Sequence, residues 1–283
     1  MTGDAFSLIQ FTDRVGLNVA ALLSIGFALH AALGIVERDA FKRLRLAAVV
    51  SGCAVVVLAA VRLAALTAQM GDGTTLLDPD LLALAWIALG PSTLVLTAGA
   101  FASAAGMLLG SRLVLGLGAI VTSISFGLTG HTQSLVEPGL TPALVAVHAL
   151  IAGFWIAAPV TLYPHSALKD EALLKRLERF SAMAVAAIPV LIGLGLWLTV
   201  TLAGGASVLV SSPYGLLLMT KLVAACLAMG AGAFNKQVVT RRVASDPARG
   251  RNWLARTLLF EVSLFGITIL AISAATTIAG PGE

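Results

Sequence analysis

The chain has 283 residues, of which 58% are hydrophobic and 11% are charged, and its formal net charge is +4. Soluble domains carry about a quarter of charged residues. The low charge, together with a mean hydropathy of +0.97, excludes an ordinary soluble enzyme and predicts an all-α polytopic membrane protein. The basic balance does not indicate nucleic-acid binding, because the bases are explained by loops that face anionic lipid.

About eight apolar stretches are long enough to cross a hydrocarbon core of roughly 30 Å, which needs about 20 residues per helix. We expect spans at 10–34, 46–69, 81–108, 113–134, 142–163, 180–203, 214–236 and 256–279. The loops between them are too short for a separate soluble domain. Residues 1–283 are therefore predicted to form a single integral-membrane domain.

Fifteen of the eighteen basic residues lie in every second loop, and the alternate loops contain only acidic charges. The basic loops hold Arg38, Lys42, Arg43, Arg45, Arg112, Lys169, Lys175, Arg176, Arg179, Lys236, Arg241, Arg242, Arg249, Arg251 and Arg256. The positive-inside rule places these loops in the cytoplasm and both termini outside it. The first residues lack a basic segment and contain Asp4, so no cleavable signal peptide is expected.

Proline positions predict where helices begin and bend. Thr141-Pro142 and Ser212-Pro213 are typical of helix starts, with an N-cap residue before a first helical proline. Kinks are expected inside three spans, at Pro91, Pro159 and Pro189. Small residues crowd the third span between residues 97 and 106, which indicates close packing against a neighbouring helix.

Six ionisable groups are expected in the outer half of the bilayer, away from the basic loops. They are Asp13, Arg14, Arg62, His131, His148 and Lys221. His131 ends the fourth span and His148 lies about 10 Å into the fifth at 1.5 Å per residue, so the two imidazoles can face each other. Imidazole is a common ligand of copper, zinc and iron. The alternative is that each histidine is a hydrogen-bonded core residue.

Further polar and sulfur-containing side chains lie within the apolar spans. Met219, Cys226 and Met229 share one helical stripe, and their thioether and thiol groups suit a soft ion such as Cu(I), although ordinary helix packing is the favoured explanation of the stripe. Cys53 and Cys226 are expected to be buried free thiols. The bases Arg14, Arg62 and Lys221 are expected to pair with Asp13, with backbone carbonyls or with an anion. Glu261 is expected to be a proton site or an interfacial partner of Arg256.

The chain resembles the copper resistance protein D family of bacterial inner-membrane proteins, best over 179–281. The resemblance rests on Arg179-Phe180-Ser181 with Gly193-x-Gly195, on Ser212-Pro213-Tyr214-Gly215 with Leu218, Lys221, Leu222 and Asn235, and on Arg256-x-Leu258, Glu261 and Gly266. Upstream, Gly130-His131, His148 and Trp155 are similar to family elements of the fourth and fifth spans.

The resemblance implies a copper-binding protein of the inner membrane that is not an enzyme and that acts as a permease moving copper from the periplasm to the cytoplasm. The cargo would be a copper ion held by His131 and His148, delivered by a periplasmic copper-binding partner similar to CopC. Two alternatives stay open. One is a b-type haem redox protein with the same two histidines as axial ligands. The other is a copper-delivery or assembly factor for a membrane oxidase.

Overall fold

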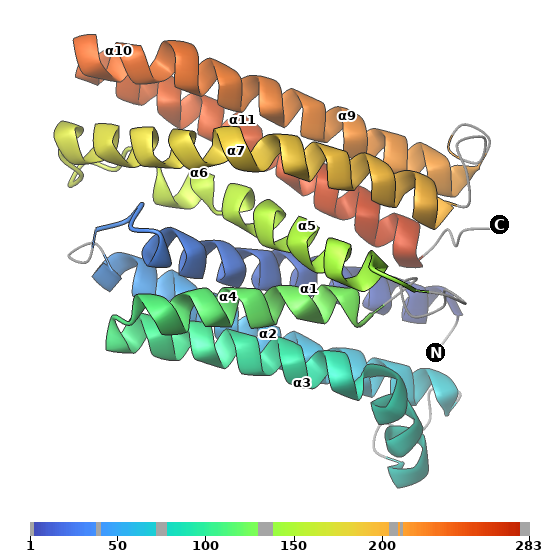
Figure 1. Ribbon diagram of the computed structural model, residues 1–283. Helices are drawn as coiled ribbons and strands as arrows, with labels where there is room; N and C mark the ends of the chain where they lie inside the picture. Colours follow the sequence, from blue (N-terminus) through green and yellow to red (C-terminus); the bar gives the residue numbers. More distant parts are fainter. Residues whose placement is uncertain are drawn as a thin grey trace.

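The computed structural model describes residues 3–37, 41–71, 78–129, 138–203, 209 and 212–277. Over these residues the chain is a bundle of long helices, and none of them forms a strand (Figure 1). The helices are α1 Gly3–Ala32, α2 Phe41–Met70, α3 Pro79–Leu109, α4 Arg112–Gly127, α5 Thr141–Ile156, α6 Ala158–Thr161, α7 Asp170–Ala203, α9 Pro213–Phe234, the π-helical turn η3 Asn235–Val239, α10 Thr240–Ser245 and α11 Pro247–Thr277.

Seven helical segments of the described chain are long and apolar enough to cross a membrane. The prediction of an all-α polytopic membrane protein is therefore confirmed. The expected fourth span corresponds to α4, an apolar helix of 16 residues that is shorter than the other seven. The continuation of that predicted span, from residue 130 onward, lies outside the described residues.

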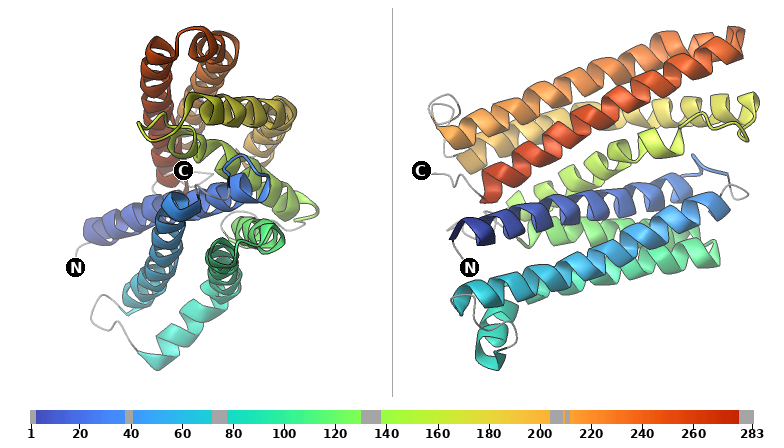
Figure 2. Two further views of the ribbon diagram at one scale, coloured as in Figure 1. Left: turned by 90° about the vertical axis from the view of Figure 1, so that its left-hand side faces the viewer. Right: turned by 180° about the vertical axis from the view of Figure 1, so that it is seen from behind.

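The helices form two groups that meet along α1 and α5. Helices α1 to α4 make one group, with α1 packed against α2, α4 and α5, while α7, α9, α10 and α11 make the other (Figures 1 and 2). Helices α3 and α4 approach each other closely. A Cβ atom at Gly99 would lie 2.4 Å from the backbone nitrogen of Thr122, and one at Gly118 would lie 2.5 Å from that of Ser103. Small residues of the third span therefore do allow close backbone approach, as predicted.

The three prolines expected to bend helices act differently. The first turns of α3 are bent sharply away from the bundle (Figure 1), and Pro91 lies inside this helix. Pro159 is the second residue of the short helix α6, which follows the end of α5, whereas Pro189 lies inside the continuous helix α7. Ser212 is the N-cap of α9, as predicted. The prediction for Thr141 was wrong by one residue, because Leu140 is the N-cap and its side chain has no capping hydrogen bond.

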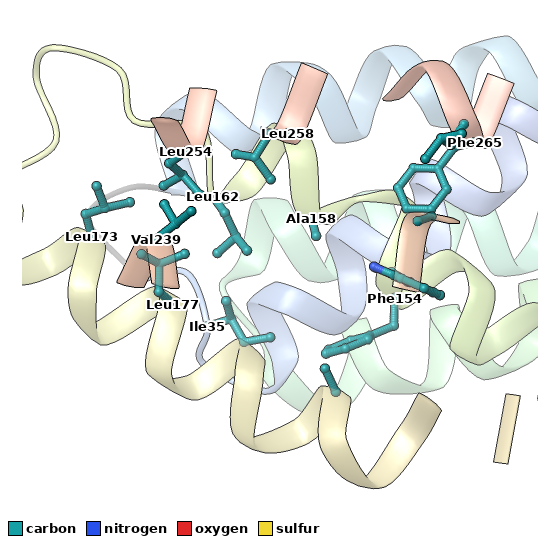
Figure 3. Close-up of a cluster of buried hydrophobic side chains, with 14 of the residues drawn as sticks. Ile35, Phe154, Ala158, Leu162, Leu173, Leu177, Val239, Leu254, Leu258 and Phe265 are labelled. Atoms are coloured by element: carbon teal, nitrogen blue, oxygen red, sulfur yellow. The ribbon is translucent and has the colours of Figure 1, made fainter. Parts of the chain in front are cut away.

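A cluster of buried aliphatic side chains fills the second group of helices at its end near the basic loops. This leucine seal consists of Leu173 and Leu177 of α7, Val239 of η3, and Leu254 and Leu258 of α11, all at most 3% exposed. Figure 3 shows these side chains converging between the two helices. Because such side chains pack at the density of a crystal, the seal leaves little room for a hydrated ion.

Buried polar contacts also join the two groups of helices, at the end of the bundle where the leucine seal lies. Nδ1 of His30 lies 2.7 Å from the Thr161 hydroxyl, and Nε2 lies 2.8 Å from the Phe154 carbonyl oxygen. Arg176 donates to Glu37 at 2.8 Å and to the Thr161 carbonyl at 3.2 Å. Both nitrogens of His30 are thus used for structure, which removes this histidine from the possible metal or haem ligands.

Candidate functional site

Three adjoining cavities lie among α5, α7, α9 and α11. Cavity A, of about 230 Å³, and cavity B, of about 200 Å³, share His148, Lys221 and Thr268 in their walls. Cavity C, of about 460 Å³, shares Trp155 and Met229 with cavity B. The three cavities therefore form a series that starts near the first turn of α9 and reaches the leucine seal.

His148 stands at the junction of cavities A and B. Its helix, α5, presents it toward α7, where a Cβ atom at Gly195 would lie 3.4 Å from Cε1 and 3.9 Å from Nδ1 of the ring. Gly195 thus faces the ring of His148 at ordinary contact distance. Nδ1 is buried and has no hydrogen-bond partner among the described residues. Nearly all buried polar atoms have such a partner, so this nitrogen is a candidate ligand atom.

Lys221 of α9 shares cavities A and B with His148. No acidic side chain of the described part forms an ion pair with it. The predicted pairing of Lys221 with Asp13 is thus not formed. An ammonium group beside the imidazole repels a metal cation, whereas the free amine would add a nitrogen ligand. The position of Lys221 therefore allows it to tune any binding at His148.

The three sulfur-containing side chains of α9 separate in space. Met229 lines both cavity B and cavity C, and Cys226 lines cavity B. Met219 is 39% exposed and lines none of the three cavities. Cys53 and Cys226 are free thiols, as predicted, but the expectation that they are buried was wrong. Both side chains are exposed, and that of Cys226 lies in the wall of cavity B.

Glu261 lies at the far end of the series, in the wall of cavity C. It is 2% exposed, and its Oε1 accepts a hydrogen bond of 2.7 Å from Nδ2 of Asn235. Thr257 in turn donates to Oδ1 of Asn235. Glu261 forms no ion pair with Arg256, so it is not the interfacial partner of that base. Sequence reasoning missed this cluster, because the π-helical turn that begins at Asn235 changes which side chains face α11.

The remaining predicted groups form a separate cluster on α1 and α2. Asp13 is 5% exposed, with Oδ1 unpartnered among the described residues, and Arg14 donates to the Thr276 carbonyl. Arg62 lines a small polar cavity of about 40 Å³. Asn18 lines both this cavity and cavity A. The outer-half groups thus divide into two clusters with Asn18 between them.

His131, the second predicted metal ligand, lies outside the described residues, as does Asp72 of the acidic loop. Within the described part of the chain, no three His, Cys, Asp or Glu side chains come close enough to hold a metal ion. A metal bound at His148 would need ligands of other kinds or from segments outside that part. Thioether and amine groups in cavity B, or His131, are the donors that the sequence supplies.

Comparison with known families gives one match. Residues 174–276 match the model of the family described as CopD, copper resistance protein D. Over this segment the chain is similar to the copper resistance protein D family. The match covers α9, η3 and α10 and nearly all of α7 and α11, so it includes Lys221, Met229, Asn235 and Glu261. It begins at residue 174, and His148 therefore lies outside it. No curated protein and no solved structure matches the chain.

Proposed function

We propose that the protein binds a copper ion at His148 and conducts it across the bacterial inner membrane, from the periplasm to the cytoplasm. The match of residues 174–276 to the copper resistance protein D family supports a copper-related membrane function. The observation that carries the finer proposal is the unpartnered Nδ1 of His148 in the wall of a cavity series. The ion is cargo in this proposal rather than a resident cofactor.

The chemistry of the cavity walls suits copper better than a hard cation. Imidazole and thioether groups are ligands for copper, whereas calcium and magnesium prefer several oxygen ligands. Cavity B offers the imidazole of His148 and the sulfur atoms of Cys226 and Met229. A set of few, mixed donors also binds weakly enough to release its ion, which conduction requires.

The orientation of the protein in this proposal rests on the distribution of charge. The loops before α7 and around α10 carry the bases, so the positive-inside rule places the leucine seal near the cytoplasm. Cavity A then faces the periplasmic half of the membrane, where a CopC-like copper-binding protein would deliver the ion. Labelling of single cysteines introduced at Lys175 and at Ser212 tests the orientation, since only the second is expected to react from the periplasm.

A haem protein is the alternative that uses the same histidine. Electron transfer across a membrane generally uses two haems and therefore four axial ligands. His30 cannot supply one of them, because protein atoms occupy both of its nitrogens. A visible spectrum of the purified protein separates the two functions, since a Soret band that sharpens on reduction would refute the permease proposal.

Copper binding and copper flux measured on the same variants test the proposal. We expect His148→Ala to remove most bound copper and most uptake into sealed vesicles, while His165→Ala, in a loop outside the three cavities, leaves both unchanged. His131→Ala combined with His148→Ala is expected to add little, because residues that share one ion are not additive. Unchanged copper stoichiometry in His148→Ala would refute the assignment, and normal binding without flux in the wild type would favour a delivery factor.

A further inference from the structure

Glu261 has no place in copper binding at His148, yet its surroundings are unusual for a membrane-spanning carboxylate. Among the described acidic residues, only Asp13 and Glu261 are buried. Only Glu261 of these lines one of the three cavities. A carboxylate in an apolar span is costly and is usually retained for function.

The hydrogen bonds of Glu261 leave part of the carboxylate free. Asn235 donates to Oε1, and no described residue donates to Oε2. The Asn235 amide is neutral and is itself fixed by the Thr257 hydroxyl. The protein therefore orients the carboxylate without neutralising its charge, and a cation from the cavity can complete the pairing.

The backbone has a local irregularity that serves this arrangement. η3 closes with a hydrogen bond from the amide of Thr240 to the carbonyl of Asn235, five residues apart. The Thr240 hydroxyl donates to the same carbonyl at 2.9 Å. Such π-helical turns are often found at functional sites. Here the turn starts at the residue that holds the carboxylate of Glu261.

The position of Glu261 suits a second binding site for an ion that leaves His148. Along α9, Lys221 and Met229 are eight residues apart, and Met229 and Asn235 are six apart, which gives steps of about 12 Å and 9 Å at 1.5 Å per residue. Met229 is shared by cavities B and C, so its side chain lies between His148 and Glu261. Beyond Glu261 the leucine seal forms part of the wall of cavity C, through Leu177, Leu254 and Leu258.

We infer that Glu261, oriented by Asn235 at the π-helical turn, is an inner cation-binding site that receives the copper ion from the His148 cavity before the ion passes the leucine seal. This inference rests on the proposed function. A single carboxylate held by a neutral amide, with the exposed base Lys236 in the same cavity wall, gives a weak site, which suits transit rather than storage. Glu261 is the only acidic side chain in the wall of cavity C, so its negative charge is what lowers the free energy of a cation there.

Three variants of the full-length protein in sealed vesicles with an enclosed copper-sensitive dye test the inference. Glu261→Gln keeps the shape and the acceptor for Asn235 but removes the charge. We expect it to retain copper at His148 within about twofold and to reduce flux about tenfold or more. Glu261→Asp keeps the charge and should restore part of the flux. Glu178→Gln changes an exposed acid of α7 and should behave as the wild type.

The outcomes separate this inference from the proposed function. Wild-type flux in Glu261→Gln overturns the inner site and leaves copper binding at His148 standing. Equal loss of flux in Glu261→Gln and Glu261→Asp shows that shape rather than charge matters, and also overturns it. Loss of bound copper together with flux in Glu261→Gln shows that Glu261 only supports the fold. If His148→Ala binds and conducts copper normally, the proposed function itself fails.

Discussion

Gly195 provides a direct steric test of the metal-binding atom. Replacing it by Ala adds a methyl group 3.4 Å from Cε1 and 3.9 Å from Nδ1 of His148, both ordinary contact distances. The helix should tolerate the change, since Ala is the better helix former by about 1 kcal/mol. A metal ion lies about 2 Å from a ligating imidazole nitrogen. The methyl group therefore occupies space that the ion or its other ligands need on that side of the ring.

The expected result for Gly195→Ala is copper binding weakened about tenfold, or about 1.4 kcal/mol, the lower end of what changes around metal ligands cause. Gly193→Ala is the matched control, because a Cβ atom there meets no other atom within 4 Å. Equilibrium competition with a copper chelator measures affinity, and thermal unfolding in detergent measures stability. Equal copper affinity in the two variants would refute the idea that copper binds at Nδ1 of His148 on this side.

Three further substitutions, two of them with a control, test the charge of Lys221, the thioether of Met229 and the close packing at Gly99. Lys221→Leu should tighten copper binding about tenfold by removing a like charge from the cavity without adding a ligand, as measured by chelator competition. Met229→Leu nearly conserves volume and should lower Cu(I) flux severalfold, whereas Met219→Leu on the exposed face should not. Gly99→Ala should destabilise the protein by about 1–3 kcal/mol, because its Cβ would lie 2.4 Å from the α4 backbone. Gly116→Ala, which faces open space, should leave the melting temperature unchanged.

The segment that matches the family shows which features of the site can be predicted from local sequence. The motifs that begin at Arg179 and end near Gly266 suggested the family from residue identities alone, and the match to 174–276 confirms this. The same motifs did not reveal that Lys221 and Glu261 line different cavities of one series. Positions along a helix are known from the sequence, but the cavity that a side chain faces depends on how neighbouring helices are rotated.

The sequence by itself determined the class of the protein and the approximate ends of its helices. In lipid every backbone amide must be paired within its own segment, so long apolar stretches have to be helical, and caps such as Ser212 mark where they begin. Only the tertiary structure decided which polar side chains meet. Met219 and Met229 share a stripe in sequence, but only Met229 lines the cavities, and Asn235 reaches Glu261 beside a π-helical turn that no periodicity predicts. Helix rotation and close approach are set by contacts between segments distant in sequence, such as Gly195 of α7 against His148 of α5, and these contacts fix the site.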